Sequence, residues 1–472
     1  MKKYKVFGLV LLFIVQACGK FLEVQPRDAV FEEEVFAYPV GVYSVMNGRY
    51  QELASAATYG YEMTFGTIDI MAQYMPGKSE NQKLFSNYSY SSNSETGIEQ
   101  VTVPYWNKVY TMILDINNAI QKMEDPGFDV VPAHELNTML GELYGLRAFL
   151  HFDLLRFFGP VYRLDPDKMA IPYMTKADGN LTAILPANEV IDLLHADVEK
   201  ALGLLESDPI REDFVNPADG NENGIYSNRN YRMNYYAVTL LAARIYLWEG
   251  RNEEAFSYAN QLIDEASSNF PFIASQGAAR QNPAFSSEVL FGLENRDLHI
   301  HHRDYFSSSV AEDVILAPLP QRLQALYNNN NDFRYVAWTA PGTEGDKPYR
   351  VFVKYASNLL TPELLYFQPL MKISEAYLIA AECSASVDEA LRYLNRLRVN
   401  RGLNALSSGL SKAEITTGIV DEYAREFWGE GQLFFAYKRL NLPQIQSNSG
   451  TPRSMSPLQY EVPIPRDELR YR

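Results

Sequence analysis

The sequence predicts a mainly α-helical fold in which tetratricopeptide-like helix pairs form a scaffold carrying long ligand-binding loops. Apolar residues recur at three- and four-residue steps over several long segments, which is the period of an amphipathic helix. Residues 235–266 and 371–400 have the small-residue spacing of a helix–turn–helix repeat. Polar segments without a sustained helical period lie between these helices. We therefore expect stacked helix pairs that present loops.

The longest amphipathic segment is residues 136–158, where leucine, methionine and phenylalanine form one apolar face. Gly159-Pro160 follows directly and should end this helix. Residues 189–205 have the same period. We expect these two helices to pack as a degenerate pair with a long insertion between them.

The pair at 235–266 begins with a helix that is apolar nearly all round, so it should lie in the centre of the fold. Ala243 and Ala255 occupy the small positions of this pair. Ala380 and Ala390 occupy the small positions of the pair at 371–400. Small side chains at these positions let two antiparallel helices approach closely.

Residues 54–103, 207–230 and 268–362 are polar, with Gly, Pro and Asn scattered through them. Long segments of this kind inside a helical protein are typical of binding loops. No linker divides the chain. We expect one compact domain with two lobes, an N-terminal lobe over residues 18–268 and a C-terminal lobe over residues 269–472.

The charge and cysteine content exclude several classes of protein. The 472 residues include 42 basic and 58 acidic side chains, for a net charge of −16. Such a surface repels the phosphates of nucleic acids and of anionic lipids. The chain has only two cysteines, Cys18 and Cys383, so a disulfide framework is excluded.

The N-terminus has the pattern of a secretory signal. Three lysines precede an apolar stretch over residues 6–15, which is too short to span a bilayer. Ala17-Cys18 then resembles the processing site of bacterial lipoproteins, which predicts a signal peptide over residues 1–17 and a lipid anchor on Cys18. The alternative is an ordinary secretory signal with an incidental cysteine.

A pair of carboxylates would be needed for glycoside cleavage. Ser411 and Glu414 predict a capping box that opens a helix ending near Gly429. Acidic residues on this helix recur at a spacing of four, with basic residues nearby: Glu422, Glu426 and Glu430, with Arg425, Lys438 and Arg439. This pattern favours an ion-pair network over a catalytic pair, so no enzymatic activity is expected.

Two segments contain residue types that bind metal ions. His299 and His301 would share one face of a loop or strand, but no acid or cysteine motif accompanies them, and we interpret the segment as an exposed loop. Asp219, Asn221 and Asn223 begin like a calcium loop, yet its closing position lacks a glutamate. Apart from calcium at this weak candidate, no cofactor is expected.

Aromatic residues in two of the polar segments are the candidate ligand-binding residues. Tyr74, Tyr88 and Tyr90 lie in the first segment, and Tyr335 and Trp338 lie in the segment 268–362. Flat rings stack on the apolar faces of sugars, and tyrosine adds a polar tip. We expect these residues to converge in an exposed aromatic platform.

Several segments resemble the SusD/RagB family of outer-membrane nutrient-binding lipoproteins of Bacteroidetes. The resemblance runs across almost the whole chain that follows Cys18. The matching segments are Phe21-Leu22-Glu23, Trp106-Asn107-Lys108, Gly141-Glu142 with Leu146-Arg147-Ala148, Gly159-Pro160-Val161, residues 240–247, Ser374-Glu375-Ala376, Arg425-Glu426-Phe427, Glu430-Gly431, Lys438-Arg439 and Val462-Pro463-Ile464-Pro465.

The resemblance implies a lipid-anchored protein on the cell surface that binds an oligomeric nutrient, such as a glycan released during polysaccharide utilization. It also implies a partner, a SusC-type TonB-dependent outer-membrane transporter that receives the ligand. Family members are not enzymes. Three alternatives stay open at this point: a peptide-binding member of the same family, a tetratricopeptide adaptor that binds only protein, and a glycosidase.

Overall fold

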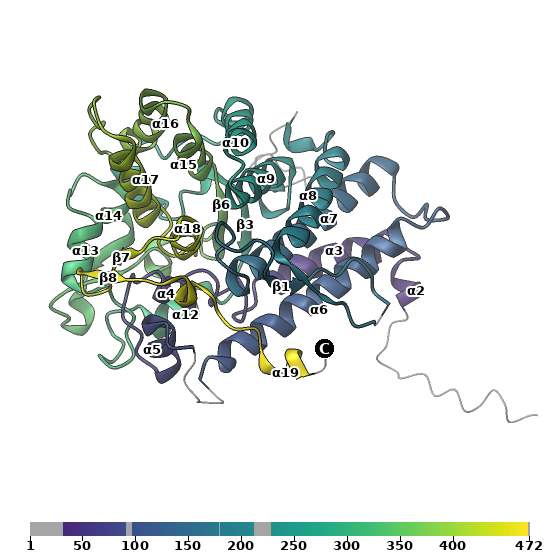
Figure 1. Cartoon of the computed structure of the whole chain (residues 1–472), viewed down its shortest axis with the longest axis horizontal. Coiled ribbons are helices and arrows are strands. Elements are labelled where there is room, and N and C mark those ends of the chain that lie inside the picture. Colours follow the sequence, from purple (N-terminus) through teal and green to yellow (C-terminus); the bar gives the residue numbers. More distant parts are fainter. Residues whose placement is uncertain (1–31, 91–96, 179, 212–227, 471–472) are drawn as a thin grey trace, which may run out of the picture.

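The structure is a computed structural model that describes residues 32–90, 97–178, 180–211 and 228–470. It is mainly helical, as the sequence predicted (Figure 1). The helices of the N-terminal half are α2 (Glu32–Val35), α3 (Pro39–Leu53), α4 (Thr67–Met71), α5 (Glu80–Asn87), α6 (Glu99–Met123), α7 (Ala133–Phe158), α8 (Ala187–Leu204), α9 (Tyr235–Glu249) and α10 (Asn252–Ala266).

The C-terminal half contains shorter helices and then a second helical group. These helices are α11 (Gln276–Gln281), α12 (Leu298–Tyr305), α13 (Pro320–Leu326), α14 (Phe333–Trp338), α15 (Ile373–Cys383), α16 (Val387–Val399), α17 (Lys412–Glu426), α18 (Leu433–Leu440) and α19 (Arg466–Arg470). None of the helices in the described part of the chain is both long and apolar enough to cross a membrane.

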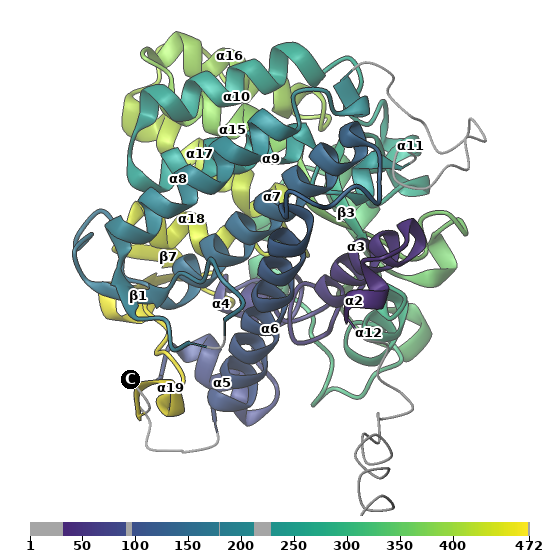
Figure 2. The ribbon, with the colours of Figure 1, turned by 90° about the vertical axis from the view of Figure 1, so that its right-hand side faces the viewer.

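The helix pairs stack in the order α7, α8, α9, α10, α15 and α16, each packed against the next. Figure 2 shows this stack crossing the upper part of the molecule in successive layers. The pairs expected at residues 235–266 and 371–400 are therefore confirmed, and α7 with α8 forms the degenerate pair. Ala243, Ala255 and Ala380 are fully buried at the helix contacts, as their spacing indicated.

One glycine shows how closely these helices approach. A Cβ atom built on Gly141 of α7 would lie 2.6 Å from Cγ of Leu205, which directly follows α8. That distance is shorter than any normal carbon–carbon contact, so a larger residue would push the two segments apart. Glycine at this position therefore permits the tight packing of α7 against α8.

The polar segments are more ordered than the sequence indicated. Residues 54–103 include the buried helix α4 as well as α5, and residues 268–362 contain α11 to α14. His299 and His301 lie on α12 and not in a loop or strand, so they do not share a strand face. Within the described residues, no group of His, Cys, Asp or Glu side chains is placed to hold a metal ion.

Among the described residues, four small antiparallel sheets connect the helices, each with two strands. The pairs are β1 (Met169–Pro172) with β2 (Ile184–Pro186), β3 (Val289–Glu294) with β6 (Phe367–Lys372), β4 (Thr339–Pro341) with β5 (Arg350–Phe352), and β7 (Gln444–Gln446) with β8 (Pro452–Ser454). The β3–β6 pair leads directly into α15, and its register shifts at two points.

The acidic helix α17 begins with the predicted capping box, in which Ser411 and Glu414 exchange hydrogen bonds. It ends at Glu426, three residues earlier than expected. The predicted ion-pair network is confirmed without two of its expected members, because Lys438 donates to the carbonyls of Phe157 and Gly159 and Arg439 pairs with Glu382. Glu422, Glu426 and Glu430 are buried and paired with other basic side chains. These partners come mainly from other elements: Arg334, Arg398, Arg401, Lys354 and Lys372.

The main core is one continuous cluster of buried apolar side chains that runs from Phe36 to Val462. It includes residues from both sides of the expected boundary near residue 268. The division into lobes over residues 18–268 and 269–472 stays a prediction.

Candidate ligand-binding cleft

Trp338, a residue of the predicted aromatic platform, lies in the interior. It is the last residue of α14 and is 0% exposed. Its indole Nε1 donates a hydrogen bond to the carbonyl of Pro283 at 2.7 Å, and its ring packs on Phe285 with the centroids 5.3 Å apart. Because no face of the ring is open, the prediction that Trp338 stacks on a ligand is wrong.

Tyr74 and Tyr88 are buried as well. The Tyr74 hydroxyl donates to the carbonyl of Ala424 at 2.7 Å, and its ring stacks on Trp428 at 5.7 Å. The Tyr88 hydroxyl donates to the carbonyl of Met71 at 2.5 Å. Both residues anchor residues 54–103 to the scaffold, so the exposed platform predicted from the sequence is not formed.

The remaining two residues of the set are half-buried. The Tyr90 hydroxyl donates to the carbonyl of Gln459 at 3.3 Å, and the guanidinium of Arg350 lies over the Tyr335 ring at 4.6 Å. A contact of either ring with a ligand stays a prediction. Cys18 and the calcium candidates Asp219, Asn221 and Asn223 lie outside the described residues.

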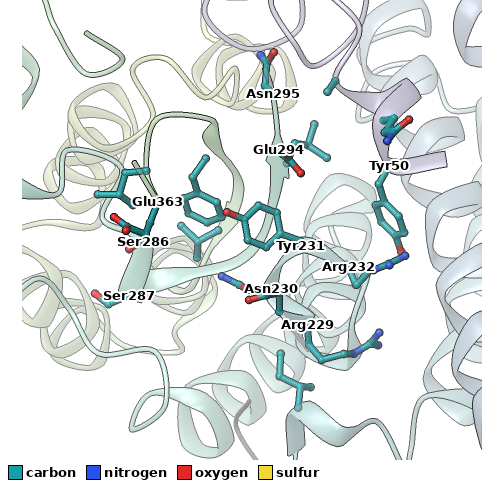
Figure 3. Close-up of a pocket in the computed structure, with 18 of the residues that line it drawn as sticks. Tyr50, Arg229, Asn230, Tyr231, Arg232, Ser286, Ser287, Glu294, Asn295 and Glu363 are labelled. Carbon is teal, nitrogen blue, oxygen red and sulfur yellow. The ribbon is translucent and has the colours of Figure 1, made fainter. Parts of the chain in front are cut away.

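An open cleft of about 1220 Å³ lies at a different place (Figure 3). Its walls come from α3, from the short 3₁₀ helices Arg229–Tyr231 and Ser286–Glu288, from β3 and from the start of β6. Half of the residues that line it are polar but uncharged, or aromatic: Asn47, Tyr50, Gln51, Asn228, Asn230, Tyr231, Asn269, Phe270, Ser286, Ser287, Asn295 and Phe367.

Tyr231 is the central aromatic residue of the cleft. In Figure 3 its ring lies between Ser286 and Glu363 on one side and Tyr50 and Arg232 on the other. The ring is half-buried and packs edge-on against Phe367, with the centroids 5.0 Å apart at 68°. Burial raises the pKa of its hydroxyl to about 12, so it is neutral at physiological pH. The hydroxyl has no hydrogen-bond partner among the residues that the structure describes and can donate to a ligand.

A buried ionic cluster fixes the segment that carries Tyr231. Arg229 is 1% exposed and donates two hydrogen bonds to Asp208, at 3.0 and 2.6 Å, and a third to Glu142 of α7. These two carboxylates raise the pKa of Arg229 further, so the guanidinium is always charged. The bidentate pair with Asp208 and the contact with Glu142 are both buried, and together they hold the Arg229–Tyr231 turn rigidly against α7.

Tyr50 extends this cluster to the wall formed by α3. Its hydroxyl donates to the second carboxylate oxygen of Glu142 at 2.6 Å and accepts from the backbone N–H of Met233 at 3.1 Å. The guanidinium of Arg232 lies over the Tyr50 ring at 4.8 Å. The cleft wall is therefore organised before any ligand arrives, which reduces the entropy lost on binding.

Asn295 fixes the opposite edge. Its side-chain amide donates to the carbonyl of Gly60 at 2.9 Å and to Oε1 of Gln368 at 2.7 Å. Its Oδ1 accepts from the backbone N–H of Asp297 at 3.1 Å. Ser287 donates to the carbonyl of Pro271 at 2.9 Å, which leaves its oxygen able to accept from a ligand.

The charges in the cleft nearly cancel. Arg229 is neutralised by buried carboxylates, and exposed Arg296 pairs with Glu294 at 3.0 Å. Arg232 is then balanced by the exposed acids Asp297 and Glu363. A cleft with many amides, a few rings and no excess cation suits an uncharged, polar ligand with many hydrogen-bonding groups.

The sequence indicated part of this site. Residues 207–230 were identified as one of three polar binding segments, and the cleft includes Asn228 to Asn230. Tyr231 directly follows that segment, whereas the aromatic residues predicted to bind the ligand all lie in the other two segments. A tyrosine placed between a polar segment and the buried helix α9 was the available signal.

Two family models match the chain. The model described as "Starch-binding associating with outer membrane" matches residues 20–247. The model described as "SusD family" matches residues 361–461. Among curated proteins, the chain is similar to SusD-like protein P2 of Formosa agariphila, with 23% identity over 527 residues that cover 99% of this chain and 97% of that protein.

Solved structures share the fold. A SusD superfamily protein from Bacteroides thetaiotaomicron has a TM-score of 0.73 at 20% identity, and the match covers 91% of this chain and 97% of that one. A SusD-like carbohydrate binding protein from Bacteroides vulgatus has a TM-score of 0.67 at 20% identity, with 87% and 84% of the two chains covered.

Proposed function

The chain belongs to the SusD/RagB family, and from this premise we propose that it captures an oligomeric glycan in the cleft around Tyr231. The observation that carries the proposal is the composition of this cleft, where amides and serines surround a tyrosine ring whose hydroxyl is free. Sugars offer apolar ring faces and many hydroxyls, which match such a surface. The family model described as starch-binding and the similar structure named a carbohydrate binding protein support the same ligand class.

We further propose that the protein is lipid-anchored at the outer membrane, exposed on the cell surface, and delivers its ligand to a SusC-type TonB-dependent transporter. The association with the outer membrane is supported by the description of the matching family model. Affinity purification from native outer membranes in mild detergent should recover a large β-barrel protein with this chain. Recovery of the chain alone would contradict the proposed partnership.

Binding without catalysis fits the carboxyl groups of the cleft. Glu294, Asp297 and Glu363 are all exposed. The acid of a glycosidase is instead usually held in apolar surroundings that raise its pKa. We therefore propose that the bound glycan leaves the cleft uncleaved, which chromatography of oligosaccharides after long incubation with the protein would test.

The ligand class is tested by calorimetry with neutral oligosaccharides of several linkages and with short uncharged peptides. Tyr231→Ala should weaken glycan binding about tenfold, because it removes both a stacking face and a hydroxyl donor. Tyr231→Phe isolates the hydroxyl. Tyr38→Ala is the matched control, since Tyr38 is 65% exposed and does not line the cleft.

The outcomes separate the remaining alternatives. Binding of peptides but of no glycan would favour the peptide-binding type of family member. Binding of neither, together with capture of a protein partner only, would favour an adaptor. Unchanged glycan affinity in Tyr231→Ala would place the ligand elsewhere on the surface.

A further inference from the structure

A second pocket, of about 370 Å³, lies between α13, α17 and the β7–β8 hairpin. These elements lie together on the left-hand side of Figure 1, and the pocket shares no lining residue with the cleft around Tyr231. Its size is that of a small-molecule site. The residues that matter for its chemistry are Arg322, Thr416, Thr417, Asp421, Arg425 and Gln444.

Arg322 is the unusual residue of this pocket. Its side chain is buried, with the residue only 2% exposed, and its Nε donates to the carbonyl of Gln73 at 3.0 Å. Its Nη2 has no hydrogen-bond partner, and no carboxylate of the described residues forms an ion pair with it. A buried guanidinium without a carboxylate in direct contact is unfavourable, because its lost hydration is not fully replaced. A ligand carboxylate in the pocket would replace it.

The rest of the pocket offers groups that bind hydroxyls. Thr416 and Thr417 donate to the carbonyls of Lys412 and Ala413, each at 3.0 Å, which leaves both hydroxyl oxygens free to accept. The exposed amide of Gln444 can both donate and accept. A cation beside several hydroxyl-binding groups fits a small polyhydroxy acid.

Two other charged residues line the pocket, and one of them, Asp421, interacts electrostatically with Arg322 without forming an ion pair. The guanidinium of Arg425 is already paired with the buried carboxylate of Glu422 at 2.9 Å. Asp421 lies at the edge, 54% exposed and 3.9 Å from Arg425. Its carboxylate would repel an incoming anion, and burial raises its pKa, so the repulsion weakens where the group is protonated.

We propose that this pocket binds a sugar acid of about one ring, with the carboxylate on the guanidinium of Arg322 and the hydroxyls on Thr416, Thr417 and Gln444. This assignment does not rest on the proposed function of the cleft, which suits uncharged oligomers. The site would give the protein a second specificity for acidic sugars.

The test is calorimetry with D-glucuronate and, as its uncharged counterpart, D-glucose. Glucuronate should bind, and glucose should bind at least about tenfold more weakly, because it lacks the charge-assisted contact. Arg322→Gln should weaken glucuronate binding about tenfold to a hundredfold. Equal affinities for the two sugars, or no binding of glucuronate, would overturn the proposal.

Two further variants keep the result independent of folding defects. Asp421→Asn removes the repelling carboxylate and should strengthen glucuronate binding about twofold to fivefold, a gain that misfolding does not produce. Ala325→Trp should block the pocket from the exposed side of α13, whereas Gln324→Trp, on the same helix but outside the pocket lining, should bind normally. Weaker binding in Asp421→Asn, or normal binding in Ala325→Trp, would contradict the assignment.

Discussion

The ammonium group of Lys354 lies over the ring of Trp338, with Nζ 4.0 Å from the ring centroid, and both side chains are fully buried. The same Nζ donates to the carbonyl of Trp428 at 3.1 Å and pairs with Glu430. Trp338 therefore helps to enclose the ammonium group of Lys354. The carboxylate partner of this group, Glu430, directly follows the turn after α17. Its role is to hold the scaffold together.

We predict that Trp338→Ala will destabilise the fold strongly. The substitution leaves a cavity, exposes the buried charge of Lys354 and removes the hydrogen bond to Pro283. Loss of a buried tryptophan alone costs about 3–5 kcal/mol of unfolding free energy. Urea unfolding followed by circular dichroism measures this change.

Trp338→Phe is the matched variant for this test, because it keeps an aromatic face under Lys354 and loses mainly the indole N–H. It should cost clearly less than Trp338→Ala. A melting curve of Trp338→Ala that overlays that of the unchanged protein would show that the ring is not part of the core.

Glu426 connects three buried cations. Its carboxylate accepts from Arg401 at 2.6 and 2.9 Å and from Arg334 at 3.0 Å, and Lys372 lies 3.1 Å away. These cations lower the pKa of Glu426 well below its ordinary value, so it is ionised in the folded protein. We predict that Glu426→Gln will cost about 3–5 kcal/mol, because it leaves buried cations without their counter-charge.

Glu389→Gln is the control for this variant. Glu389 pairs with Arg392 at 3.3 Å on the surface of α16, where both side chains are partly or largely exposed. A surface pair of this kind contributes only about 0–1 kcal/mol. If chemical denaturation gives the same small loss for both variants, the burial of the Glu426 network does not matter for stability.

The helix pairs could be predicted because their signal is local. The apolar period of residues 136–158 and the small residues Ala243 and Ala255 report on contacts within one helix pair. The same reasoning found the spacing of Glu422 and Glu426 on one helix. It could not find Arg401 or Lys372 as their partners, because these come from other elements that only the tertiary fold brings close.

The candidate site was harder to predict for two physical reasons. Polar segments need buried rings to hold them against the scaffold, so Tyr74, Tyr88 and Trp338 face inward although their sequence neighbours are polar. The cleft is also assembled from distant segments, with Tyr50 and Glu363 on different elements. No spacing in the sequence predicts that residues so far apart lie in the same cleft.

Cys18 remains the predicted attachment point of the lipid anchor. We expect Cys18→Ser to move the protein from the membrane fraction to the soluble fraction, because acyl chains contribute about 0.8 kcal/mol per buried CH₂ to membrane binding. Fractionation and immunoblotting measure this shift. Changing the second cysteine, Cys383→Ser, should leave the distribution unchanged, and retention of Cys18→Ser in membranes would contradict the anchor.

His151 of α7 is held neutral by two hydrogen bonds. Its Nδ1–H donates to the carbonyl of Arg147 at 2.9 Å, and its Nε2 accepts from the backbone N–H of Met174 at 3.0 Å. The ring stacks on Tyr173 with the centroids 3.8 Å apart. Protonation would set an N–H on Nε2 against the N–H of Met174, in a fully buried site. Burial, more than any other cause, lowers the pKa of His151 from 6.5 to about 3.

This depressed pKa predicts a loss of stability in acid. Between pH 6.5 and about pH 3 the unfolded chain binds a proton at this histidine and the folded chain does not. The unfolding free energy therefore falls as the pH drops through this window, by up to about 1.4 kcal/mol per pH unit for one site. Burial also lowers the pKa of His302 to about 4, so His302 contributes a similar loss of unfolding free energy in acid. Urea unfolding at several pH values between about 6 and 4 gives the slope of the unfolding free energy against pH. In His151→Gln this slope should be smaller by the equivalent of about one proton. An unchanged slope in that variant would mean that His151 is already protonated in the folded protein.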